Sequence, residues 1–519
     1  MPSWAANNRP RFRRAPRFFG GLCAVPALFH SKCKDGDPGL TFLSLPFFCF
    51  FPITALGYFC LPRRVKNLWL LLASWFFYLW ARPVYLSLLL FVIAASYLTG
   101  RLLAGRRRKG VLALCLAVLG VLLFLFKYVN FALSLAGQAL GLLGLTVSMP
   151  VLELVLPVGI SFYLFQAMGY VIDVYRGKAE AQRDFLRYAL FLSFFPQVVS
   201  GPIARADQLL PQFDRPHPFQ WDAFRAGLFR FLWGAFKKMV LADQLAVLVN
   251  TVFSAPESFG AVQLAGAAVA FSLQIYCDFS AYSDMALGTA GAMGFTLMEN
   301  FRTPYFSRSI AEFWRRWHIS LSSWFRDYLY IPLGGSRRGT ARKYVNVLIV
   351  FAVSGLWHGA AMTFVVWGVL NGLYQVAGAL TQPLRDRAWA ALHVSPEGKV
   401  RRLVQVGCTF VLATIAWVFF KASTLEGALA VLGGMLRGPL WVPLSMGLNR
   451  WDLLAVAAGL LLLLLVDLRS VNHSLTGGYL ALPRPGRWAV LWVLLFACLI
   501  FGSYGTGYDA QSFLYGFSF

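Results

Sequence analysis

Charged side chains are scarce in this 519-residue chain, where Asp, Glu, Lys and Arg together make up 13% of the residues. Soluble domains carry about a quarter, so this scarcity excludes an ordinary soluble protein. Hydrophobic residues make up 58%. Apolar runs long enough to cross the ~30 Å hydrocarbon core of a bilayer recur along the chain. The composition therefore predicts an all-α, polytopic integral membrane protein.

About eleven or twelve crossings are expected, together with re-entrant or interfacial helices. The Gly-rich run 129–147 is ambiguous, because the basic loop 176–187 requires either that this run does not cross or that another span is split. The candidate runs are 41–61, 67–82, 84–100, 111–127, 129–147, 154–174, 184–199, 224–251, 260–276, 279–298, 343–356, 359–380, 402–420, 452–468 and 487–504.

Acidic residues are fewer than basic residues, with 22 Asp and Glu against 47 Lys and Arg. A net charge of +25 is compatible with nucleic-acid binding. However, basic clusters at 63–66 and 101–109 follow alternate spans, as the positive-inside rule expects. The charge is therefore predicted to set membrane topology, and nucleic-acid binding is not expected.

Cysteine is present eight times without any CxxC or other metal-ligand spacing. Most of these residues lie in apolar runs, where cysteine behaves as a small hydrophobe. We expect no disulfide, no cysteine nucleophile and no metal site.

The first forty residues differ from the rest of the chain. A basic stretch, RPRFRRAPRFF, precedes the short apolar stretch GGLCAVPALF, a pattern typical of a signal or start-transfer segment. An upstream extension without consequence is the alternative. Residues 41–519 are predicted to form the membrane domain.

Histidine occurs six times, and two of the six lie in unusual surroundings. His358 interrupts the apolar run SGLWHGAAMTFVVWGVLNG between Trp357 and Gly359. An ionisable side chain at bilayer depth is costly and usually marks a functional site. The pattern favours a base that lines a cavity, while a structural histidine bonded across helices is the alternative.

His318 lies in the segment EFWRRWHISLSSWFRDYLYIPLGG. Interleaved aromatic residues and arginines over 312–335 predict one amphipathic helix at the membrane interface. In such a helix His318 would share a face with Trp314, Arg315 and Ser322. Its alternative role is that of an interfacial anchor.

Further polar residues interrupt other apolar runs. Asp278 and Asp284 lie in IYCDFSAYSDMALG, and Asp173 and Arg176 have the i,i+3 spacing of a helical ion pair. SFFPQVVSGPIARADQL breaks a helix at two places. These features indicate either structural ion pairs and kinks or a polar interior.

Several long motifs, in order, resemble the membrane-bound O-acyltransferase family, specifically its alginate O-acetyltransferase type from bacterial exopolysaccharide export. The resemblance runs from about residue 42 to 519. The motifs are PVGISFYLFQAMGYVIDVYRG, FPQVVSGPIAR, YCDFSAYSDMALG, NFRTPYFSRSIAEFWRRWHISLSSWFRDYLYIPLGG, SGLWHG and the aromatic ending SFLYGFSF.

The resemblance implies a helical bundle around a transmembrane tunnel in the bacterial inner membrane. It assigns the family's catalytic histidine to His358 and its second active-site position to His318. It also implies an acyl thioester donor on the cytoplasmic side, acetyl-CoA, with no bound cofactor. An SGNH-hydrolase-like acetyltransferase partner and a polysaccharide acceptor complete the expected system.

The expected mechanism uses His358 as general base on an acceptor hydroxyl, because neutral imidazole accepts a proton near pH 7. His318 would orient the acceptor or donate to the oxyanion. Both direct transfer and an acyl-histidine fit these residues. Arg315 and Arg316 would hold donor phosphates or serve as interfacial anchors. Further candidates for substrate binding are Trp317, Ser322, Trp357 and Asp278.

Two alternatives remain open. A D-alanyl transfer protein for teichoic acid would use a carrier-protein thioester. A transporter for a polymer or lipid-linked sugar would explain the broken helices and the intramembrane carboxylates.

Overall fold

The part of the chain that the structure describes is helical throughout. The computed structural model describes residues 40–504 except 82–83, 107, 146, 148, 155 and 216, and every regular element in these ranges is a helix. The predicted all-α class is confirmed. The signal-like segment up to residue 39 and the aromatic ending lie outside the described residues.

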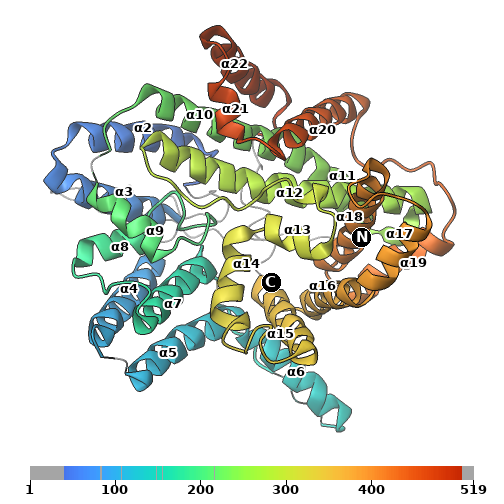
Figure 1. Ribbon diagram of the computed structural model, residues 1–519, viewed down its shortest axis with the longest axis horizontal. Helices are drawn as coiled ribbons and strands as arrows, with labels where there is room; N and C mark the ends of the chain where they lie inside the picture. Colours follow the sequence, from blue (N-terminus) through green and yellow to red (C-terminus); the bar gives the residue numbers. More distant parts are fainter. Residues whose placement is uncertain are drawn as a thin grey trace, which may run out of the picture. The chain divides into compact units, whose positions relative to one another are not determined.

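The helices, labelled as in Figure 1, follow one another with short connections. Their bounds are α2 Leu45–Cys60, α3 Arg63–Ala81, α4 Val84–Leu103, α5 Lys109–Lys127, α6 Val129–Leu142, α7 Ile160–Arg176, α8 Phe185–Ser193, α9 Ala206–Leu209, η1 Leu210–Asp214, α10 Trp221–Phe236, η2 Lys237–Ala242, α11 Asp243–Ser254, η3 Pro256–Ser258, α12 Ala261–Ala292, η4 Pro304–Phe306, α13 Ile310–Arg316, α14 Ile319–Phe325, η5 Arg326–Tyr330, α15 Thr340–His358, α16 Met362–Leu380, α17 Gln382–Ala391, α18 Lys399–Lys421, α19 Leu425–Arg437, α20 Arg450–Ser470, α21 Leu475–Leu480 and α22 Arg484–Phe501.

Seven described helices are long and apolar enough to cross a membrane by length and composition: α4, α5, α12, α16, α18, α20 and α22. The fourteen residues of α6 reach only about 21 Å at 1.5 Å per residue, short of the ~30 Å hydrocarbon core. This length supports the reading in which the ambiguous run 129–147 does not cross. The total of eleven or twelve crossings stays a prediction.

The longest helix corrects one expected boundary. The runs 260–276 and 279–298 were expected to be separate, but they form the single helix α12 of 32 residues. Within this helix Asp278 and Asp284 are each paired with a lysine of η2. α10 and α12 pack along each other, as Figure 1 shows.

The segment 312–335 was expected to be one helix, and this is wrong. α13 ends at Arg316, and His318 has the left-handed backbone angles φ 43° and ψ 55° before α14 starts. The backbone oxygen of Asn300 accepts from the Ile319 N–H at 2.9 Å, and its side-chain oxygen accepts from the Ser320 N–H at 3.2 Å. These bonds cap α14 from outside the segment, so the chain can turn at His318.

α15 and α16 form a closely packed hairpin. A Cβ atom on Gly355 would lie 2.2 Å from the backbone oxygen of Phe364, and one on Gly368 would lie 2.3 Å from that of Phe351. Small residues at such contacts let membrane helices approach closely. The hairpin thereby places the end of α15, and with it His358, against α16.

Candidate active site

His358 is the last residue of α15 and lies among aromatic rings. Its ring centroid is 4.9 Å from that of Trp357, 5.1 Å from that of Trp367 and 5.3 Å from that of Phe420. Its Nε2 atom is enclosed and has no hydrogen-bond partner among the described residues. The aromatic surroundings hold the imidazole while leaving this nitrogen available.

His318 lies in the turn between α13 and α14 and is 1% exposed. Its ring centroid is 4.6 Å from that of Phe279 and 5.9 Å from that of Trp357. Within the described part of the chain neither of its ring nitrogens has a hydrogen-bond partner. Unpartnered buried polar atoms are uncommon and require an explanation.

The structure brings the two histidines together from segments forty residues apart. Their ring centroids are 6.4 Å apart, and Trp357 contacts both rings. Three imidazole nitrogens of this pair have no hydrogen-bond partner among the described residues. Such a group of nitrogens can remove a proton from one substrate atom and donate a hydrogen bond to another.

The protonation state of His318 follows from its surroundings. It lies outside the seven candidate spans, and burial without a compensating charge lowers its pKa from 6.5 to about 3. The imidazole is therefore neutral near pH 7, with one N–H donor and one acceptor nitrogen.

Two hydrogen bonds join the end of α15 to Lys127, the last residue of α5, and to Tyr128, the residue after it. Lys127 Nζ donates to the backbone oxygen of Trp357 at 2.5 Å, and the Tyr128 hydroxyl donates to that of Leu356 at 2.9 Å. Both carbonyl groups belong to the last turn of the helix, where intrahelical donors are missing. Sequence reasoning missed these two residues, although Lys127 is a cation closing an apolar run.

The remaining predicted site residues have different surroundings. Trp317 is buried against Phe313 and Trp417, at ring distances of 5.3 and 5.0 Å. Ser322 donates from its backbone N–H to the His318 oxygen at 2.9 Å. Trp357 lines the histidine pair, as described above.

The two arginines have different surroundings. Arg315 is exposed, while Arg316 bonds Glu312 at 2.6 Å and the Thr303 hydroxyl at 3.3 Å. Because α13 ends at Arg316, the helical face expected to join His318 with Trp314, Arg315 and Ser322 does not exist.

The intramembrane carboxylates form ion pairs. Asp278 lies 3.1 Å from Lys238 Nζ, while Asp284 bonds both Lys237 at 2.6 Å and Arg230 at 2.9 Å. The possible pair of Asp173 with Arg176 is not formed. Asp173 instead accepts from the Tyr328 hydroxyl at 2.5 Å, and Arg176 donates to the backbone oxygen of Asp327 at 3.0 Å.

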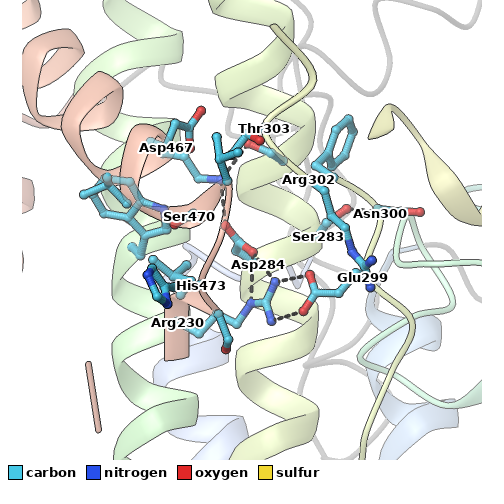
Figure 2. Close-up of a pocket in the computed structure, with 18 of the residues that line it drawn as sticks. Arg230, Ser283, Asp284, Glu299, Asn300, Arg302, Thr303, Asp467, Ser470 and His473 are labelled. Atoms are coloured by element: carbon cyan, nitrogen blue, oxygen red, sulfur yellow. Dashed lines mark hydrogen bonds and ion pairs between the residues drawn. The ribbon is translucent and has the colours of Figure 1, made fainter. Parts of the chain in front are cut away.

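A polar cavity of about 380 Å³ opens beside this ion network. Figure 2 shows Arg230 between Asp284 and Glu299, with both carboxylates bound to its guanidinium. Asn300, which caps the turn at His318, also lines the cavity. The residue that caps α14 therefore also borders the cavity.

Sequence reasoning noted the carboxylates of this network but missed its cations. Arg230, Lys237 and Lys238 all lie inside the apolar run 224–251. The rule that ionisable residues at membrane depth are functional or paired applies to them equally.

No three His, Cys, Asp or Glu side chains approach closely enough to hold a metal ion in the described ranges.

The helical membrane fold agrees with the comparison to known families. The model of the membrane-bound O-acyltransferase family matches residues 179–420, which include both His318 and His358. With the relatives below, this match shows that the chain belongs to that family and is an O-acyltransferase.

Three relatives show what this chain is similar to. The chain is 39% identical over 398 residues to the probable alginate O-acetylase AlgI of Pseudomonas putida, covering 75% of this chain and 78% of that protein. It is 36% identical over 424 residues to the peptidoglycan O-acetyltransferase of Helicobacter pylori, with coverages of 75% and 78%. Identity to the teichoic acid D-alanyltransferase of Streptococcus thermophilus is 29% over 288 residues, covering 51% of this chain and 68% of that protein.

Proposed function

We propose that this enzyme moves an acetyl group from acetyl-CoA on the cytoplasmic side across the membrane for O-acetylation of an exported polysaccharide such as alginate. One observation carries the proposal. The ring centroids of His318 and His358 lie 6.4 Å apart, and their nitrogens lack hydrogen-bond partners within the described ranges, in a chain whose relatives include alginate O-acetylases.

In the proposed reaction His358 Nε2 takes the proton of an acceptor hydroxyl as the oxygen bonds to the thioester carbonyl carbon. This role requires the tautomer with the proton on Nδ1. A positioned base contributes about 10²–10⁴-fold to the rate. The carbon–sulfur bond then breaks, and the imidazolium returns the proton to the departing sulfur. The products are an ester and a free thiol.

His318 serves the carbonyl oxygen in this scheme. Its neutral ring has one N–H, and a donor to the developing oxyanion is worth roughly 3–4 kcal/mol in acyl transfer. Direct transfer and an acyl-histidine intermediate use the same two side chains. Trapping a labelled acetyl group on the protein would distinguish the two routes.

The polar cavity supports an approach of the donor from the cytoplasmic side. Arg63 donates to the backbone oxygen of Asp214 at 2.5 Å, and the nearby Gln212 side chain donates to that of Thr296 at 2.9 Å. The segment after α12, whose residues 299–303 line the cavity, therefore lies near the basic α2–α3 connection. Such basic connections face the cytoplasm.

The cavity mouth also suits an anionic donor. Arg302 and His473 line it and are exposed, and guanidinium groups match phosphate geometry. These residues replace Arg315 and Arg316 as the better candidates for donor phosphates, because Arg315 does not line the cavity and Arg316 is bonded to Glu312.

In this proposal the enzyme works in the bacterial inner membrane and passes the acetyl group to a partner protein. A periplasmic or membrane-anchored SGNH-hydrolase-like acetyltransferase would receive the acetyl group and complete transfer to the polymer. Alginate and peptidoglycan are the acceptors named for the relatives at 36–39% identity.

D-alanyl transfer is the second candidate, favoured by the match to teichoic acid D-alanyltransferases at 29% and 27% identity. Labelled acetyl-CoA and labelled D-alanyl carrier protein, each added to membranes containing the enzyme, separate the two. We expect release of free thiol and transfer of label with acetyl-CoA only. Transfer from the D-alanyl carrier alone would contradict the acetyl donor.

The test of the proposed base compares two histidine variants in an alginate-producing bacterium that lacks its own O-acetylase. We expect His358→Ala to lower the O-acetyl content of the polymer by at least about 10²-fold. The control is His393→Asn, at an exposed residue after α17 whose backbone is also left-handed, with unchanged acetylation. A His358→Ala protein that inserts normally and retains full acetylation would refute the mechanism.

A further inference from the structure

The last turn of α15 is held by the end of α5, and we infer that Lys127, assisted by Tyr128, is a positioning residue for acyl transfer. The two side chains fix Trp357 and His358 in the arrangement that faces His318. This inference rests on the proposed function, because it concerns the residue that acts as base there.

The hydrogen bonds are specific to the residues beside His358. A helix leaves its last four carbonyl groups without intrahelical donors. Lys127 Nζ donates to the Trp357 oxygen at 2.5 Å and the Tyr128 hydroxyl donates to the Leu356 oxygen at 2.9 Å. The two carbonyl groups that immediately precede His358 are therefore bound to consecutive residues of another helix end.

Lys127 also contacts the ring of Trp357, which lies against both histidines. Its Nζ lies 5.5 Å from the centroid of the Trp357 ring, within the range of a cation–π contact. That ring is 4.9 Å from His358 and 5.9 Å from His318. Loss of Lys127 would thus remove a contact of the Trp357 carbonyl group and a contact of the Trp357 ring. We expect both contacts to help set the distance between the two imidazoles.

In the described ranges the Lys127 side chain donates its hydrogen bond to the Trp357 oxygen at the end of α15. It thereby satisfies a carbonyl group that the helix leaves without an intrahelical donor. No carboxylate forms an ion pair with Lys127 among the described residues, in contrast to Lys237 and Lys238. A lysine in an apolar bundle is costly, and here the α15 terminus is its partner.

The test uses the purified full-length enzyme with acetyl-CoA as donor and an alginate oligosaccharide as acceptor, and measures thiol release. Lys127→Met removes the donor and keeps the length of the side chain, and Lys127→Arg keeps a cationic donor. Tyr128→Phe removes only the hydroxyl. The matched control is Lys421→Met, because Lys421 also closes a helix and bonds a side chain, Asn250, at 2.7 Å.

We expect Lys127→Met to lower kcat by about 10²-fold, since an error of about 1 Å in the position of a catalytic group has effects of this size. KM for acetyl-CoA should change by less than about 3-fold, because Lys127 is not among the described residues that line the donor cavity. Lys127→Arg should restore most of kcat, and Tyr128→Phe should lower it by about 10-fold. Lys421→Met should retain both constants.

His358→Ala is measured in parallel so that the two hypotheses fail separately. A fully active His358→Ala enzyme overturns the proposed function. An inactive His358→Ala enzyme beside a Lys127→Met enzyme of normal kcat overturns the positioning role alone. If Lys127→Met does not insert, Tyr128→Phe decides, and normal kcat in that variant also overturns the inference.

Discussion

An imidazole without a hydrogen-bond partner is expensive inside a protein. Leaving a buried polar group unsatisfied costs about 1–3 kcal/mol. His318 leaves both ring nitrogens unsatisfied, and His358 leaves Nε2 unsatisfied, in the described part of the chain. Because the two rings adjoin, one substrate can satisfy these nitrogens together, and we interpret their free state as readiness for catalysis.

The role of His318 can be tested with a variant that preserves its backbone. Asparagine tolerates the left-handed conformation observed at this position better than most residues. We therefore expect His318→Asn to insert normally and to lower kcat by about 10²–10³-fold, as does loss of one oxyanion donor elsewhere. Thiol release from acetyl-CoA measures this loss.

The pH dependence of the same variant tests the protonation state of His318. With a pKa of about 3, His318 is neutral throughout the range in which the enzyme can be assayed, so its contribution should be equal at about pH 6 and about pH 8. The ratio of wild-type to His318→Asn rates should be constant between these values. A ratio that changes tenfold would show that His318 titrates in this range.

At the scale of the element, the break between α13 and α14 places His318. The residues of 312–335 have the composition of a single amphipathic helix, and composition alone did not reveal the turn. The cap that ends this pattern comes from Asn300, eighteen residues before His318, through bonds to Ile319 and Ser320. A local pattern cannot report a partner supplied by another segment.

The hairpin of α15 and α16 is the second element on which the site depends. We expect Gly368→Leu to lower stability by about 1–3 kcal/mol, because a Cβ there would lie 2.3 Å from the Phe351 oxygen and must push the helices apart. Activity should fall further, since His358 lies at the end of α15. The thermal unfolding midpoint in detergent and the rate of thiol release measure the two effects.

The control for this variant lies on the same helix. A Cβ atom on Gly378 would have no neighbouring atom within 4 Å, so Gly378→Leu should leave both the midpoint and the rate unchanged. Equal losses in the two variants would show that α16 tolerates no large residue anywhere. The close approach at Gly368 would then have no special importance.

At the scale of the whole molecule, an ion network joins distant segments of the bundle. Arg230 of α10 bonds Asp284 of α12 and also Glu299 after it, while Lys237 bonds Asp284 from η2. Breaking a buried pair by removing one partner costs about 3–5 kcal/mol, because a charge is left without compensation.

We therefore expect Arg230→Met to destabilise the protein strongly and to reduce the amount recovered in the membrane. Arg225→Met is the control on the same helix, because its partner Asp222 is exposed and such pairs contribute about 0–1 kcal/mol. Unfolding midpoints of the two variants in detergent make the comparison. An Arg230→Met protein as stable as Arg225→Met would contradict the structural role of the network.

The amino-acid sequence by itself determined the class of this protein. Scarce charge and repeated apolar runs leave only a helical membrane bundle, because every backbone polar group must be satisfied inside lipid. The sequence also singled out His358, because an ionisable residue in an apolar run usually marks a functional site, and His318, because it lies among interleaved aromatic residues and arginines.

Only the tertiary structure decided how these residues meet. It paired His318 with His358 across forty residues and matched Asp278 and Asp284 with lysines. It also brought Lys127 to a helix end more than two hundred residues later in the chain. Each of these contacts joins segments with no shared local pattern. They depend on which helices pack together, and periodicity within one segment carries no information about that choice.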